Sequence, residues 1–206
     1  GIGRSGSTLR ALWNDGGRAY TAASGTDGTS WVTQGVIYNG SATYARLTNF
    51  SLCVSGGTWL AVFNGVTAGG VWHVRGVQRT TGWSSWAQMP YSGVDWQVVG
   101  LRAGSPYEPE PCAYAYLTGI VGGYSVLACQ RVALNADGTF SAWDGSPKIV
   151  DRAGPANGVN YGRARLGDAA GAYLFALQER AVSGYWFVGA LYGLPGSLDI
   201  EEPIYL

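Results

Sequence analysis

The chain has 206 residues and a formal net charge of zero, from 13 basic and 13 acidic side chains. A neutral chain of this composition has no electrostatic footprint for nucleic acid or an anionic membrane surface, and no apolar stretch is long enough for a spanning helix. With 47% hydrophobic residues, 13% aromatic residues and 33 glycines, it fits one all-β domain with many tight turns rather than a disordered chain.

The first predicted strands cover residues 11–14 and 18–22 and are separated by Gly16-Gly17. The segment Asp27-Gly28-Thr29-Ser30-Trp31 then marks a turn and the start of another strand. The N-terminus has no initiator Met and no apolar signal segment, so we expect a processed chain or a domain of something longer.

The same order of elements recurs three more times along the chain. Each later copy has three predicted strands followed by one marker residue. The second copy has strands at residues 51–54, 61–64 and 71–75 and the marker Trp86. The third has strands at 96–99, 113–117 and 124–128 and the marker Trp143, and the fourth has strands at 162–165, 172–176 and 185–188 and the marker Ile200. Residues 173–181 also suit a helix, but the repeat predicts a strand there because propensity is a weak prior.

The spacing of the markers defines the repeat. Trp86 lies 55 residues after Trp31, Trp143 lies 57 after Trp86, and Ile200 lies 57 after Trp143. The first copy lacks a recognisable first strand, which a neighbouring chain could donate. We therefore expect one domain of four repeats, at approximately residues 8–40, 44–92, 94–150 and 158–206.

A repeated four-stranded antiparallel unit is typical of a β-propeller blade. The fold class predicted is therefore all-β, a propeller-like array of about four antiparallel four-stranded repeats. A β-sandwich built from the same hairpins is the alternative.

Two families have similar repeat motifs. The segment from Gly70 to Arg79, followed by Trp83-Ser84-Ser85-Trp86, resembles the blades of bacterial propeller lectins that bind fucose and related sugars. The pairing of Gln78-Arg79 with Trp86, and of Gln130-Arg131 with Trp143, resembles phage tail-fibre and pyocin knob segments. Both resemblances imply recognition of surface glycans without catalysis. Because a single copy contains His and the fourth has no Trp at the marker position, one or two unequal sites are expected.

Sugar binding needs flat aromatic faces beside planar hydrogen-bonding groups. The candidate ligand-binding residues are Trp72, His73, Arg75, Trp83 and Tyr107. Trp72 and His73 alternate along a strand, so they cannot face one pocket from a regular strand. Trp86 and Trp143 mark one position of the repeat and are expected to be core anchors.

No catalytic set is predicted. Glycosidases need two carboxyl groups that face each other across the bond, whereas most acids here lie in turns. Glu108 and Glu110 alternate with prolines in what is expected to be a stiff extended loop. The segment from Asp27 to Trp31 resembles the Asp-box turn of sialidases, which is a structural element. His73, as the sole histidine, is expected to have a structural or hydrogen-bonding role.

No cofactor or metal is expected. Cys53, Cys112 and Cys129 are odd in number and show no metal-binding spacing, so small buried side chains are the simplest interpretation.

The function predicted is a non-enzymatic recognition module on a virion or cell surface, of the tail-fibre or lectin type, that binds cell-surface glycans. The alternative is a structural subunit of a phage tail, capsid decoration or extracellular filament without ligand binding. An extracellular or virion-surface location follows from either hypothesis, without nucleic acid or membrane insertion. A single lysine, Lys148, is available to protect open strand edges, which favours a homo-oligomer or larger assembly.

Overall fold

The structure is a computed structural model that describes residues 1–25, 28–104, 108–152, 160–169, 173–182, 185–193 and 204–205, with side chains up to residue 150. All regular elements of these ranges are β-strands. The first sheet consists of β1 (Ile2–Ser5), β2 (Thr8–Asp15), β3 (Arg18–Ser24) and β4 (Trp31–Asn39). The second consists of β5 (Arg46–Ser55), β6 (Thr58–Val66), β7 (Trp72–Arg79) and β8 (Trp83–Ser85).

The third sheet consists of β9 (Gln97–Ala103), β10 (Cys112–Val121), β11 (Tyr124–Leu134) and β12 (Phe140–Arg152). The fourth consists of β13 (Asn160–Ala169), β14 (Tyr173–Val182), β15 (Tyr185–Gly193) and β16 (Ile204–Tyr205). Within each sheet, strands that are consecutive in the chain are antiparallel neighbours, so each sheet is a simple meander. Four repeated four-stranded units are therefore present, as the sequence predicts.

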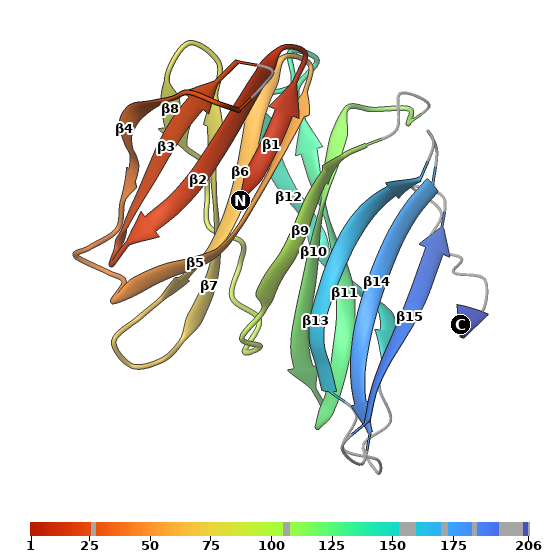
Figure 1. The fold of residues 1–206 in the computed structure, drawn as a ribbon. Helices are drawn as coiled ribbons and strands as arrows, with labels where there is room; N and C mark the ends of the chain where they lie inside the picture. The colour runs from red at the N-terminus through yellow and green to blue at the C-terminus, as the bar shows by residue number, and fades with distance from the viewer. Residues whose placement is uncertain are drawn as a thin grey trace.

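The four sheets follow one another in chain order (Figure 1). Their first strands follow one another through the array: β1 packs against β5, β5 against β9, and β9 against β13. Gly1 lies against Phe50 and Gly3 against Leu52, so β1 and β5 run in the same direction. Sheets arranged around their first strands form a propeller-like array rather than a two-layered sandwich.

Two details of the repeat are decided by the strand pairing. The expectation that the first copy lacks its first strand is wrong, because β1 pairs with β2 from Ile2↔Ala11 to Ser5↔Thr8. No donated strand is needed at that position. Residues 173–181, whose composition also suits a helix, lie in strand β14, which pairs with β13 and β15. The strand predicted from the repeat is therefore confirmed. Ile200, the marker of the fourth copy, lies outside the described residues.

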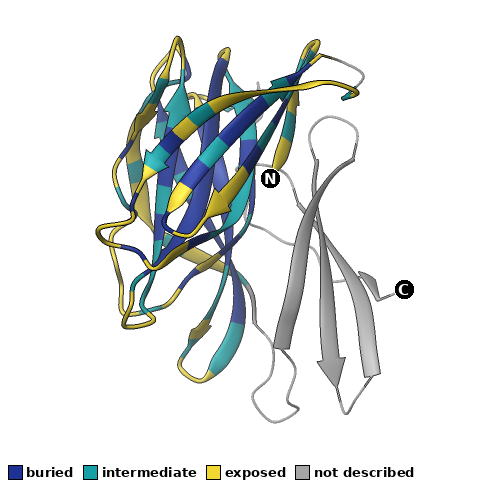
Figure 2. Cartoon of the chain, turned by 60° about the vertical axis from the view of Figure 1, so that its left-hand side comes forward, coloured by how far each residue is buried: buried dark blue, intermediate teal, exposed yellow. Residues whose placement is uncertain are grey.

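The main core lies between the second and third sheets, and buried residues are concentrated in the middle strands (Figure 2). Trp86 is 6% exposed and stacks on Phe140 with ring centroids 5.1 Å apart, while Trp143 meets it edge-on. The Trp86 ring lies directly over Gly76, where a Cβ would come within 1.5 Å of it. The expected anchoring role of Trp86 is confirmed, and Trp143 packs beside it, half-buried.

One buried amide joins the second sheet to the third. Asn64, on β6, is fully buried. Its Nδ2 donates to the carbonyl of Trp96 at 2.7 Å, and its Oδ1 accepts from the backbone N–H of Val98 at 2.7 Å. Asn49, which has a positive φ of 55°, donates to the same Oδ1 at 3.0 Å. Because buried polar groups need partners, this amide fixes the register of β9 against the second sheet.

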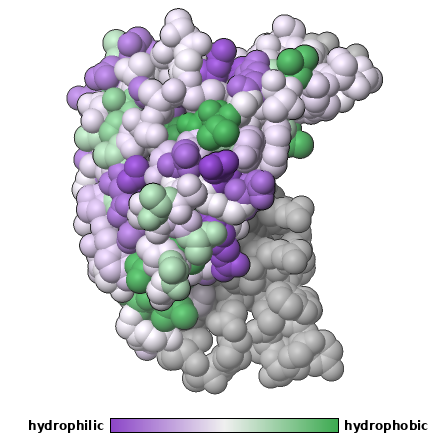
Figure 3. Space-filling model, turned by 90° about the vertical axis from the view of Figure 1, so that its left-hand side faces the viewer, coloured by the Kyte–Doolittle hydropathy of each residue, from purple (hydrophilic) through white to green (hydrophobic). Residues whose placement is uncertain are grey.

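The outer strand of the first sheet is much more exposed than the strands of the core. On β4, Trp31, Val32 and Val36 are exposed, although polar neighbours separate the apolar groups on this side of the molecule (Figure 3). The 55-residue spacing in the sequence matches Trp31 with Trp86, but the pairing matches it with Trp83: Trp31 lies opposite Ser24, and Trp83 lies opposite Arg79. In the described part of the chain, no helix is long and apolar enough to cross a membrane.

Candidate functional site

A cavity of about 380 Å³ opens between the second and third sheets. We call it the carboxylate cavity, and its walls include Val54, Gly56, Gly104, Glu108, Glu110, Pro111, Cys112 and Gly138. It lies at the end of the sheets where β5 turns into β6 and β9 connects to β10. The cavity therefore belongs to the junction between two blades.

Two tight turns pack against each other at one wall of this cavity. Gly138 has a φ of 79°, and a Cβ there would come within 2.1 Å of the carbonyl oxygen of Ser55. The Thr58 hydroxyl donates to the carbonyl of Asp137 at 3.1 Å, which fixes one turn to the other. Glycine is needed because no side chain fits between the two backbones and the φ lies in the left-handed region. This wall is therefore rigid backbone.

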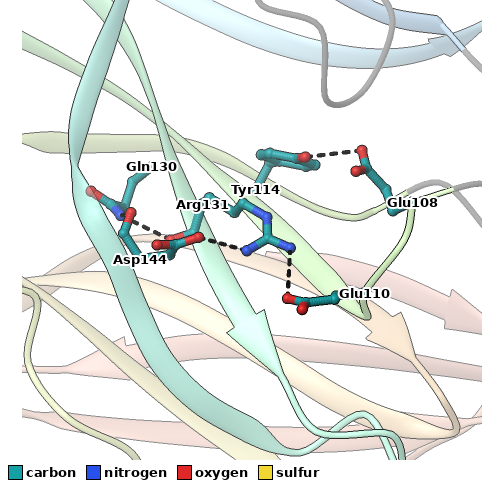
Figure 4. A network of polar contacts seen from close by, with 6 residues as sticks. All are labelled: Glu108, Glu110, Tyr114, Gln130, Arg131 and Asp144. Carbon is teal, nitrogen blue, oxygen red and sulfur yellow. Dashed lines mark hydrogen bonds and ion pairs between the residues drawn. The ribbon is translucent and has the colours of Figure 1, made fainter.

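The two carboxylates of the cavity have different partners (Figure 4). The Tyr114 hydroxyl donates to Glu108 Oε1 at 2.9 Å. Glu110 Oε2 lies 3.9 Å from Arg131 Nη2, and its side chain is 77% exposed. One carboxylate therefore meets a neutral hydroxyl and the other a cation.

Asp144 and Gln130 position the Arg131 cation. Arg131 Nη1 donates to Asp144 Oδ2 at 2.6 Å, and this hydrogen bond raises the pKa of Arg131 above its ordinary value. The buried Gln130 amide donates to the carbonyls of Arg131 and Asp144, at 2.8 and 2.9 Å. These bonds fix the backbone of β11 and β12 beneath the ion pair, so Arg131 faces Glu110 from a defined position.

Burial keeps the neighbouring phenol and thiol protonated. The pKa of Tyr114 is raised, chiefly by burial and then by the nearby Cys112, so its hydroxyl remains a donor to Glu108. Burial also raises the pKa of the Cys112 thiol. Since the thiolate is the nucleophile, a neutral thiol is a poor one. The carboxylates are therefore the groups of this cavity suited to acid–base chemistry.

The predicted ligand residues lie elsewhere. Trp72 stacks with the Arg46 guanidinium, and its backbone N–H donates to Asp95 at 3.0 Å. His73 contacts the hydroxyl of Tyr44 through Nδ1 at 3.3 Å and meets Tyr91 edge-on. These contacts lie at the opposite end of the sheets from the carboxylate cavity.

The remaining three candidates are scattered. The guanidinium of Arg75, beside His73 on β7, stacks over Tyr38. Trp83 is half-buried at the junction of the first and second sheets, with Arg10 over its ring. Tyr107 lies outside the described residues. The structure therefore brings Trp72, His73 and Arg75 close to one another on β7 and separates Trp83 from them.

The segment of alternating Glu and Pro, expected to be a stiff extended loop, contributes two carboxylates to the carboxylate cavity. Glu108 and Glu110 line one cavity, and their partners Tyr114 and Arg131 come from strands that only the pairing of β10 with β11 brings together. The alternation of Glu with Pro was the available signal. Among the described residues, no group of three or more His, Cys, Asp or Glu side chains could hold a metal ion.

No protein-family model and no curated protein sequence matches the chain. Among solved structures, a thermostable family-43 glycoside hydrolase superposes with a TM-score of 0.63 at 9% identity, over 93% of this chain and 67% of that one. The endo-arabinase of Bacteroides thetaiotaomicron gives 0.61 at 13% identity, over 97% and 77%. A levansucrase of B. subtilis gives 0.54 at 10% identity, over 90% and 63%.

These matches share an architecture with the chain, which spans 63% to 77% of their lengths. The prediction of a non-enzymatic recognition or structural module, with no enzyme activity, is contradicted by them. That prediction took the repeated blade as evidence for a lectin or tail fibre, whereas the structures that superpose on it are enzymes that process sugars. At these identities the likeness establishes the fold alone: an all-β, propeller-like array of the type found in glycoside hydrolases.

Proposed function

We propose that this chain is a carbohydrate-active domain that cleaves or transfers a glycosidic bond in the carboxylate cavity. The observation that carries the proposal is that Glu108 and Glu110 line one cavity. Glycoside cleavage uses two carboxyl groups, one as a proton donor and one as a base or nucleophile. The fold shared with glycoside hydrolases and levansucrase supports the same chemistry.

The two carboxylates are held by different groups of the cavity wall. Arg131 lies beside Glu110, and the Tyr114 hydroxyl donates to Glu108. One carboxyl group acts as proton donor and the other as base or nucleophile, and the pH dependence of kcat in each Gln variant would assign the two roles. In this scheme Gln130 and Asp144 take no part in cleaving the bond; they position Arg131.

The test is hydrolysis of a panel of aryl glycosides and oligosaccharides that includes arabinan, β-1,3-galactan and sucrose, with release of reducing sugar as the readout. We expect Glu108→Gln and Glu110→Gln each to lower kcat by about 10²–10⁴-fold, the usual contribution of a positioned acid or base. The matched control is Asp15→Asn, which removes an exposed carboxylate from the last residue of β2, at the opposite end of the sheets.

Circular dichroism would establish that each variant is folded before its rate is compared. A wild-type protein that turns over no member of the panel would refute the activity. Turnover that survives both Gln substitutions would refute the assignment of this cavity as the active site.

A further inference from the structure

The junction between the first and second sheets contains a buried arginine without a described carboxylate partner. Arg10, on β2, is 4% exposed. Its guanidinium lies between two aromatic rings, 5.1 Å from the ring centroid of Trp59 and 5.7 Å from that of Trp83. Gly3, opposite Arg10 on β1, leaves room for the Trp59 ring, because a Cβ there would come within 3.2 Å of it.

The hydrogen-bond donors of this cluster outnumber its acceptors. An arginine has five N–H donors. Among the described residues, Gln34 Oε1 accepts from Arg10 Nη1, whereas Arg10 Nε has no acceptor. The indole N–H of Trp83 is also buried without an acceptor. A buried donor without a partner is costly, so the cluster needs a group that can accept hydrogen bonds.

A second guanidinium makes the cluster strongly positive. Burial and the neighbouring Arg79 both lower the pKa of Arg10. Arg79 itself donates to the carbonyl of Thr80 at 3.4 Å. Because that carbonyl is neutral, this contact does not balance the charge of the Arg79 guanidinium. The ion pairs found among the described residues involve Arg131, at a different junction. The missing acceptor should therefore carry negative charge.

The cluster has an open side. Gln34 is exposed, and Arg79 and Trp83 are half-buried, whereas Arg10 lies beneath them. The strands β4 and β8, which contribute Gln34 and Trp83, pack against each other at this junction. Trp59 directly follows the β5–β6 turn, and the other side of that turn, at Val54 and Gly56, lines the carboxylate cavity. Both features therefore lie at the same end of the sheets.

We propose that Arg10, Arg79, Trp59 and Trp83 form a binding site for the carboxylate of an acidic saccharide. A guanidinium matches a carboxylate in a planar two-point contact, and the half-buried Trp83 presents apolar ring surface at the open side of the cluster. The assignment rests on the proposed function, because it names carbohydrates that contain uronic acid as the substrate class of the carboxylate cavity, which lies at the same end of the sheets. We call this cluster the Arg10 site.

The experiment measures binding rather than turnover. Trigalacturonate, neutral galactotriose and sodium sulfate are titrated into the full chain by isothermal calorimetry at low ionic strength. We expect trigalacturonate to bind at least tenfold more tightly than galactotriose. Arg79→Gln should weaken trigalacturonate about tenfold, the usual effect of losing one charge-assisted hydrogen bond, and leave galactotriose unchanged. Arg79 is half-buried and is replaced in preference to Arg10, whose loss could unfold the junction.

The control is Arg18→Gln, which removes an exposed arginine at the opposite end of the first sheet and should leave all affinities unchanged. Equal affinity for the acidic and neutral trisaccharides, no binding of either, or binding of sulfate alone would each overturn the proposal and leave Arg10 as a structural contact between sheets. Cleavage of neutral glycosides without a preference for galacturonate would refute this inference and keep the proposed function. Tight galacturonate binding without any cleavage would refute the proposed function and keep this inference.

Discussion

Asn64 provides the sharpest test of how the second and third sheets are held together. In Asn64→Ala, the carbonyl of Trp96 and the N–H of Val98, both from buried residues, lose partners at 2.7 Å. Each buried backbone group left unpaired costs about 1–3 kcal/mol, so the free energy of unfolding should fall by about 3–5 kcal/mol once the small cavity is included. Urea unfolding followed by tryptophan fluorescence would measure it.

The repeat supplies a matched control. Asn14 occupies the equivalent position of the first sheet but is exposed, so Asn14→Ala should change the free energy of unfolding by less than about 0.5 kcal/mol. Asn64→Asp keeps the shape and the acceptor, but in its ionised form it cannot donate to Trp96. Burial would raise the pKa of the new carboxyl above its unfolded value, so its stability deficit should shrink as the pH falls.

A loss below about 1 kcal/mol for Asn64→Ala, or an equal loss for Asn14→Ala, would refute the role given to this amide.

Three further predictions concern packing, thiols and the surface. Gly76→Ala should displace the Trp86 ring and cost about 3 kcal/mol or more in urea unfolding, whereas Gly82→Ala, with open space around it, should be nearly neutral; similar losses would contradict the packing described. Burial raises the pKa of Cys129 to about 12, so a thiol reagent at pH 8 should label it in denaturant and not in the native protein. The contribution of this thiol to the free energy of unfolding is complete below pH ~8.5 and is lost as the pH rises toward 12. Rapid labelling of the native protein would refute this. Asp144→Asn breaks a half-exposed ion pair with Arg131 and should cost less than about 1 kcal/mol, with the effect reduced by salt; a loss above ~2 kcal/mol would mean the pair is structural.

The architecture could be predicted because local sequence features, such as turn glycines and apolar strands, define the repeat. Gly122-Gly123 takes positive φ at both positions, as a tight hairpin turn requires, and the strands on either side are rich in aromatic and apolar residues. Strand β1 was missed because Ile-Gly-Arg-Ser has no apolar alternation; its pairing with β2 makes it a strand. Local composition cannot reveal a strand that its neighbour defines.

The sites were harder to predict because they depend on contacts between sheets. Trp31 and Trp83 lie at the same position of the first and second sheets, opposite Ser24 and Arg79, yet Trp31 is 40% exposed whereas Trp83 is half-buried with Arg10 over its ring. Arg131 faces Glu110 because of the pairing between β10 and β11. A repeat gives equivalent positions in sequence, but their surroundings differ with the neighbouring blade.

The two junctions described here use different chemistry, and this bears on how the molecule comes apart. Both junctions have apolar cores, but the polar contact between the second and third sheets is a neutral buried amide, whereas that between the first and second is a guanidinium between indole rings. In a repeat protein, stability is approximately a sum of terms for each unit and each interface. A carboxylate bound at the Arg10 site would stabilise the contact between the first and second sheets. We therefore expect bound acidic saccharide to make the first sheet unfold together with the second rather than before it.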